Sequence, residues 1–155
     1  MTRTPLRIAL LSLLALGLVS PAGAQPAIAV RAARPSLHQV QLKILQQTNA
    51  YRERAGLRPL RLDAAMSRVA TRWSQRQADE HGMSHNPAYP RQIPAGWHRC
   101  GENVAYGYSY RRVTAAWFHS PPHRQNLLGH YGRIGIGYAL DSHGVAYYTQ
   151  DFGKY

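Results

Sequence analysis

Two segments near the C-terminus, RIGIGYAL (133–140) and VAYYTQDF (145–152), constrain the fold more than any other feature of the chain. Both alternate in residue character and are rich in residue types that favour β-strands. The intervening DSHG (141–144) has the composition of a tight turn. The sequence therefore predicts an antiparallel hairpin at this end of the chain.

Helical patterns precede the hairpin. Ser36 and Gln39 have the spacing of a capping box, and Gly56 supplies a stop for the first helix. An apolar-leaning stripe follows the cap at helical spacing: Leu37, Val40, Ile44, Leu45 and Thr48. The segment is thus predicted to be an amphipathic helix, and the arginines in its last turn suit the helix dipole.

A second helix is predicted from Asp63, a good N-cap, to Gly82. One side of it carries Met66, Val69, Ala70, Trp73 and Gln77. We expect Trp73 to be a core anchor. Because Gly82 ends the helix, His81 and His85 are not stacked on one continuous helix.

The remaining elements are shorter. SYRRVTAAWFH (109–119) is predicted to be a third helix with Val113, Ala116 and Trp117 facing inward, and CGENVAYG (100–107) a short strand or turn. The Pro-rich stretch 86–97 indicates a loop. Helices interspersed with strands, ending in a hairpin, indicate a layered α+β domain.

Two histidines, His119 and His123, lie four residues apart in WFHSPPHRQN (117–126). On one helix they would share a face, but two adjacent prolines between them exclude a helix interior. Ser120 suits an N-cap and Pro121 the first position of a new helix. We therefore expect His119 on the surface. His123 falls in a first helical turn, where the helix dipole favours a neutral imidazole that can act as metal ligand or base.

The N-terminus has the pattern of a secretory signal peptide over residues 1–24, with a basic start, an apolar run and Ala22-Gly23-Ala24 before the cleavage point. The apolar run is too short to span a bilayer, so no transmembrane anchor is expected after cleavage. Residues 25–35 are interpreted as a flexible leader and 36–155 as one domain. The protein is predicted to be secreted or periplasmic.

The chain carries a formal net charge of +12, and loss of residues 1–24, which hold two arginines and no acid, leaves +10. Such a chain should adhere to anionic lipid or envelope polymers. The arginines are scattered and no nucleic-acid-binding motif is present, so specific nucleic-acid recognition is not expected. Cys100 is the single cysteine, which favours a small apolar packing role over a nucleophile.

Four stretches together resemble the CAP superfamily (cysteine-rich secretory, antigen 5 and pathogenesis-related proteins), in its bacterial, SCP-like branch. They are LRLDAAMSRVATRWSQRQADEHGMSHN, CGENVAYG, AAWFHSPPHRQNLL, and RIGIGYAL with YYTQDFG. The resemblance implies an α-β-α sandwich, with a central antiparallel sheet between helical layers.

The resemblance also implies a cleft that in some members binds a divalent metal such as zinc. Residue by residue, it assigns His85 of SHN, Glu102 of GEN and His123 of SPPHR as metal ligands. Ser120, which lines the cleft, stands where eukaryotic members place a second acid. Asn103, Asn126 and Gln150 are expected to satisfy loop and strand hydrogen bonds. Tyr106, Tyr108 and Tyr110 are candidates for one wall or for ordinary sheet packing.

Two functions remain open. The first is a secreted binding module for an envelope component, a lipid or another protein. The second is a metal-assisted extracellular hydrolase, in which Glu102 serves as ligand or base. Against the second, the chain has no H-E-x-x-H motif. A serine hydrolase built on Ser84 or Ser120 ranks third, because G-x-S-x-G is absent.

Overall fold

The computed structural model describes residues 34–155. The predicted signal peptide and nearly all of the predicted leader lie outside the described residues, so these boundaries stay predictions. The described part forms its own compact unit, Arg34–Tyr155. None of its helices is both long enough and apolar enough to span a bilayer.

A four-stranded sheet lies at the centre, in the order β1-β3-β4-β2. Its strands are β1 (Arg61–Leu62), β2 (Arg99–Tyr106), β3 (Arg133–Leu140) and β4 (Ala146–Lys154). The β3–β4 hairpin is confirmed, and β2 pairs antiparallel with β4. The sheet departs from the expected antiparallel arrangement at one edge, where the two-residue β1 runs parallel to β3.

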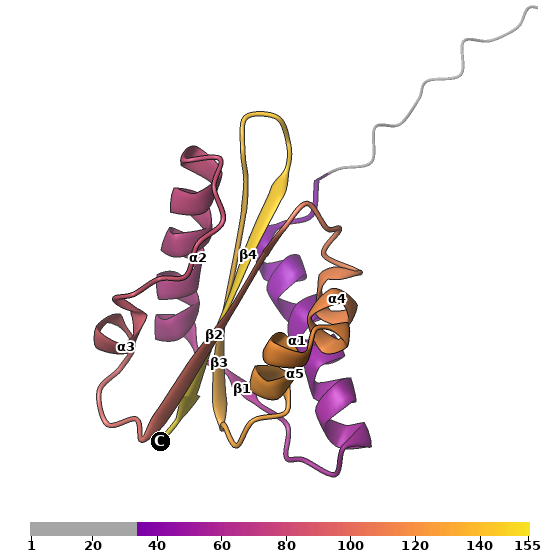
Figure 1. The fold of residues 1–155 in the computed structure, drawn as a ribbon, viewed down its shortest axis with the longest axis vertical. Helices are drawn as coiled ribbons and strands as arrows, with labels where there is room; N and C mark the ends of the chain where they lie inside the picture. The colour runs from indigo at the N-terminus through magenta and orange to yellow at the C-terminus, as the bar shows by residue number, and fades with distance from the viewer. Residues whose placement is uncertain (1–33) are drawn as a thin grey trace, which may run out of the picture. The chain divides into compact units, whose positions relative to one another are not determined.

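Helices cover both faces of the sheet (Figure 1). The helices α2 (Ala64–Asp79) and α3 (Tyr89–Gln92) lie on one side. The helices α1 (Leu37–Arg54), α4 (Val113–His119) and α5 (Pro121–Leu127) lie on the other. The predicted α-β-α sandwich is confirmed.

The first helix begins as its sequence predicts. Ser36 Oγ accepts from the backbone N–H of Gln39, and the Gln39 side chain accepts from the backbone N–H of Ser36, which completes the capping box. Val40, Ile44 and Thr48 are buried against the sheet, whereas Leu37 is exposed in the first turn.

The helix α2 lies very close to the hairpin because β3 has glycine at alternate positions. A Cβ on Gly135 would collide with the backbone of Met66, and one on Gly137 with the backbone of Ala70. The pattern IGIG (134–137) in RIGIGYAL therefore has two roles. Its isoleucines fill the core on the α1 face, and its glycines admit the α2 backbone on the other.

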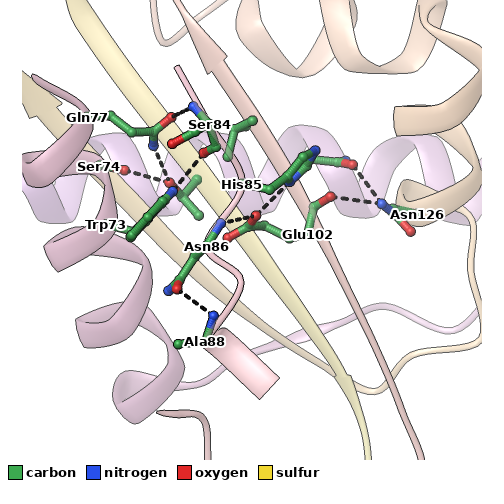
Figure 2. A network of polar contacts seen from close by, with 12 residues as sticks. Trp73, Ser74, Gln77, Ser84, His85, Asn86, Ala88, Glu102 and Asn126 are labelled. Atoms are coloured by element: carbon green, nitrogen blue, oxygen red, sulfur yellow. Dashed lines mark hydrogen bonds and ion pairs between the residues drawn. The ribbon is translucent and has the colours of Figure 1, made fainter. Parts of the chain in front are cut away.

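The expectation that Trp73 anchors the core was wrong. Its side chain is only partly buried, and its indole N–H donates to the carbonyl of Ser84 at 2.8 Å (Figure 2). The sheet-facing places on this turn of α2 are taken by Ser74 and Gln77, whose side chains bond to Thr149 on β4. Trp73 thus secures the loop that follows α2.

Two predicted helix limits also shift. The second helix ends at Asp79, and His81 follows with a positive φ of 50°, so the turn begins before Gly82. The third helix starts at Val113 and not at Ser109, because the carbonyl of Ser109 accepts from the backbone N–H groups of Arg112 and Val113 in a turn.

The main core lies between the sheet and α1, α4 and α5. Trp117 is its largest side chain, packed edge-on against Tyr148, and Val113 is buried beside it, as predicted. Burying a side chain of this kind contributes on the order of 2–3 kcal/mol. This packing fixes α4 and α5 against β2, where the candidate site lies.

Candidate functional site

The predicted site residue Glu102 lies in the middle of β2, an edge strand of the sheet. Its Oε1 is 2.6 Å from His85 Nδ1 and accepts from the backbone N–H of Asn86 at 2.9 Å (Figure 2). The Glu102 side chain is 3% exposed and the His85 side chain 63% exposed. The loop after α2 therefore places an accessible imidazole on a buried carboxyl group.

The second predicted histidine, His123, lies in the first turn of α5, and its Nδ1 is 2.8 Å from Ser120 Oγ. Ser120 is the N-cap residue of α5, as predicted, but its side chain bonds to His123 and not to a helix N–H. Burial, with a smaller contribution from His85, lowers the pKa of His123. The neutral imidazole expected from the helix dipole thus has desolvation as its main cause.

The outer edge of β2 is covered by side-chain donors. The Tyr131 hydroxyl donates to the Cys100 carbonyl at 3.4 Å. The Asn126 amide donates to the Glu102 carbonyl at 2.9 Å. The Trp117 indole donates to the Val104 carbonyl at 3.0 Å. Edge strands expose such groups unless something pairs with them. Here the donors come from α4, α5 and the loop after α5, so they hold His123 beside the strand that carries Glu102.

Three amide side chains connect this edge to the core. The Asn103 amide donates to the carbonyl of His123 at 3.1 Å and to Gln150 Oε1 at 3.3 Å. Gln150 donates to Thr48 on α1, and Asn126 donates to Asn103 Oδ1. The prediction that Asn103, Asn126 and Gln150 satisfy structural hydrogen bonds is confirmed.

The structure adds a second acid, Asp151, which the sequence reasoning missed. Asp151 on β4 is the register partner of Glu102 and has no exposed surface. Within the described chain, both its carboxyl oxygens and Glu102 Oε2 are buried without a hydrogen-bond partner. The available signal was an acid at a buried position of the alternating segment YYTQDF.

The two carboxyl groups influence each other strongly. Burial, reinforced by the neighbouring Glu102, holds the pKa of Asp151 well above its usual range. Burial also raises the pKa of Glu102, although Asn86 N–H and His85 oppose that rise. Two buried carboxylates this close cannot both ionise readily. Of the two, Asp151 is therefore the acid that retains its proton to higher pH, and Glu102 is the carboxyl group that faces His85.

A groove continues from His123 along the outer side of β2. It encloses about 540 Å³ and is lined by Met83, Val104, Ala105, Tyr106, Gly107, Tyr108, Ala116, Trp117, Ser120 and His123. Met83, Tyr106 and Tyr108 are among the exposed large apolar side chains of the described chain. Two of the three tyrosines proposed for a wall thus line this groove, and Tyr110 lies elsewhere. Ser120 also lines this groove.

The other candidates lie outside this site. His119 is exposed, as predicted. Cys100 is half-buried against the cluster of Met66, Val69, Tyr89 and Ile93 between α2 and α3, which agrees with a packing role. The Ser84 carbonyl accepts from the Trp73 indole N–H, and Ser84 has no histidine partner among the described contacts.

The residues fit a metal only in part. Among residues 34–155, no group of three or more His, Cys, Asp and Glu side chains is arranged to hold a metal ion. The Glu102 Oε1 that would serve as a ligand is engaged by His85 and Asn86. A carboxylate on the Nδ1 of a histidine, however, is the usual support of a metal-bound imidazole. The set of His85, Glu102 and His123 therefore stays a prediction.

The fold and this cleft define a sandwich protein with a His/Glu site at the sheet edge, and comparison with known families names the class. The model of the CAP family, the cysteine-rich secretory protein family, matches residues 45–152. The chain therefore belongs to the CAP family.

Bacterial relatives agree with this assignment. The chain is 31% identical over 142 residues to the uncharacterized protein YkwD of Bacillus subtilis; the match covers 86% of this chain and 54% of YkwD, so the chain spans about half of that relative's length. It is 27% identical to an extracellular SCP-domain protein of Bacillus anthracis, with a TM-score of 0.62, covering 77% of this chain and 41% of that one.

An outer surface protein of Borrelia burgdorferi has the same fold over nearly its full length. The TM-score is 0.67 at 20% identity, and the match covers 74% of this chain and 92% of that one. At this identity the likeness supports the fold alone.

Proposed function

We propose that this chain is an exported CAP-domain binding module for an envelope, lipid or protein partner, and that the cleft at the outer edge of β2 is its binding site. The observation that carries the proposal is the 2.6 Å contact between buried Glu102 and exposed His85. These two residues are close in the chain to Val104 and Met83, which line the groove with His123. An apolar groove with a few convergent polar groups is the common form of a ligand site.

Export is part of the proposal. It is supported by the predicted signal peptide over residues 1–24 and by relatives described as extracellular and outer surface proteins. Whether the mature chain acts in the periplasm or beyond it depends on the cell that makes it. Fractionation of cells expressing the full chain tests this part, and a precursor that stays unprocessed in the cytoplasm would contradict it.

We also propose that His85, Glu102 and His123 hold a divalent metal such as zinc. The support is the carboxyl group behind His85 Nδ1, the Ser120 hydroxyl behind His123 Nδ1, and the lowered pKa of His123, which keeps that imidazole neutral. These contacts orient histidines as outer partners do in metal sites. A bound zinc ion would supply a positive charge with a coordination position open to ligand or water.

The alternative function is a metal-assisted hydrolase that uses the same cleft. What favours it is the pair of buried acids, since raised carboxyl pKa values are typical of groups that move protons. In that case Glu102→Gln abolishes turnover of a substrate while the protein stays folded. A binding module keeps its ligand through that change, or loses the metal alone.

A calorimetric zinc titration of the purified protein tests the metal site. We expect one ion per chain, with binding lost in both His85→Ala and His123→Ala. The matched control is His119→Ala, because His119 is exposed at the end of α4 and, among the described contacts, its side chain forms no hydrogen bond with Glu102 or Ser120. Absence of zinc binding by the wild type, or equal binding by all three variants, would contradict the metal site. The proposal would then rest on the groove alone as the binding site.

A further inference from the structure

A second hollow lies at the end of the sheet where β1 and β3 begin and β4 ends. It encloses about 880 Å³ and is formed by residues 56–61, 130–133 and 154–155, together with Arg52. It shares no lining residue with the groove beside His123. We call it the basic groove because five of its side chains carry permanent positive charge: Arg52, Arg58, Arg61, Arg133 and Lys154.

Little negative charge offsets these cations. Arg133 is paired with Asp63 at 3.0 Å. Arg58, Arg61 and Lys154 are exposed and form no ion pair within residues 34–155. Even with Asp63 counted against the five cations, the groove stays positive.

The strand register brings like charges together at this same end. Arg99 on β2 is the register partner of Lys154 on β4, and Arg61 on β1 is the partner of Arg133 on β3. Like charges directly opposite each other on paired strands destabilise a sheet. Arg61, Arg133 and Lys154 line the basic groove, so an anion bound there would offset part of this concentrated positive charge.

The walls of the basic groove are fixed in place by Arg52. This residue is 2% exposed, and its guanidinium donates to the carbonyls of Arg58, Leu127, Gly129 and Tyr131. These carbonyls belong to the loop before β1 and to the segment leading from α5 to β3. The exposed cations are therefore carried on backbone segments that Arg52 holds together, which lowers the ordering cost of binding a ligand.

We propose that the basic groove binds an anionic polymer whose chain carries repeated oxyanion groups, either phosphate or carboxylate. Arginine forks match both groups in a bidentate geometry. A polymer fits better than a bilayer surface, because the cations line a hollow. In addition, the exposed large apolar residues of the described chain, which a membrane anchor would need, lie elsewhere: Leu37, Leu42, Met83, Tyr106 and Tyr108. This binding is independent of the His/Glu cleft.

The test compares two double variants of equal net charge. Arg58→Gln with Arg61→Gln removes two cations from the basic groove, and Arg68→Gln with Arg72→Gln removes two exposed cations from α2, outside that groove. Affinity is measured by calorimetry for short-chain inorganic polyphosphate and for polyglutamate. We expect the groove variant to lose about tenfold or more for whichever polymer binds, and the α2 variant about twofold or less.

Thermal melts establish that both variants fold, and Lys154→Gln gives an independent single change in the groove. Equal losses in the two double variants would mean that only net charge matters, and would overturn the proposal. Absence of binding to both polymers would overturn it too. So would binding to phosphatidylglycerol vesicles that neither polymer displaces, because the partner would then be a membrane. Zinc has no part in these assays, so their outcome is separate from that of the cleft.

Discussion

Two buried charged regions of this protein differ in how their polar atoms are satisfied. The Arg52 guanidinium is buried among four carbonyl acceptors and has no ion pair within the described chain. Glu102 and Asp151 are buried as well, but three of their carboxyl oxygens receive no hydrogen bond. Burying a polar group without a partner costs free energy, whereas a satisfied one costs little.

This difference in hydrogen bonding indicates a structural role for one region and a functional role for the other. A buried charge whose partners are all backbone atoms ties loops together and needs nothing from outside. Unsatisfied acids beside an accessible histidine are costly to the fold, and such costs are concentrated at functional sites. We therefore interpret Arg52 as a structural clamp and the acid pair as part of the cleft.

The largest expected effect follows from removing the clamp. Arg52→Met should lower the free energy of unfolding by about 3 kcal/mol or more, because several buried carbonyls lose their donor at once. Urea denaturation measures this. The control is Arg54→Met on the same helix, which is exposed and should change stability by about 0.5 kcal/mol or less. A small loss at Arg52 would contradict its role as a clamp.

An intermediate effect is expected at the border of the two regions. Asn126→Ala removes the donor to the Glu102 carbonyl and to Asn103 Oδ1. We expect a loss of about 1–2 kcal/mol in the free energy of unfolding. Because α5 also carries His123, zinc affinity should fall as well. A variant that loses stability but keeps full zinc affinity would show that the edge of β2 does not position the cleft.

Asp151→Asn tests the acid pair through pH. In the wild type the folded state holds the Asp151 proton more tightly than the unfolded state, because its pKa is raised. The contribution to stability is therefore complete below the usual aspartate pKa of about 4 and is lost as pH rises above it. The variant should show a flatter dependence, and denaturation at a series of pH values measures it. An unchanged slope would mean that Asp151 is ionised in the folded state.

The smallest effect on stability is expected for Ser120→Ala. It removes the hydroxyl on His123 Nδ1 but no helix-capping bond, so the loss should be about 0.5 kcal/mol or less. Loss of an outer partner should nevertheless weaken zinc binding about tenfold. The control is Ser109→Ala, whose exposed side chain does not line the groove beside His123. A full N-cap loss of about 1 kcal/mol would contradict the observed contact.

The sequence was sufficient where local rules decide the structure. The hairpin follows from alternation and a turn, the start of α1 from Ser36 and Gln39, and the separate helix around His123 from two prolines. These are interactions between neighbours in the chain, so their patterns are visible in it. The resemblance of the GEN and SPPHR motifs adds the prediction that Glu102 and His123 belong to one site.

What the sequence did not reveal depends on long-range packing. The pattern around Arg52 indicates only a cation in the last turn of a helix, and the structure buries it beneath loops from residues 127–131. Asp151 becomes the missing second acid only because β4 pairs with β2 in one register. Trp73 faces a loop because smaller polar residues take the sheet face. None of these outcomes can be read from spacing along a single helix or strand.

The central claim is that the outer edge of β2 presents His85 and His123 to one ligand site. Nuclear magnetic resonance of the imidazole nitrogens during zinc addition tests it most directly. We expect the Nε2 signals of His85 and His123 to shift together to saturation at one ion, while that of His119 stays in place. Unchanged signals from His85 and His123 at saturating zinc would contradict the claim.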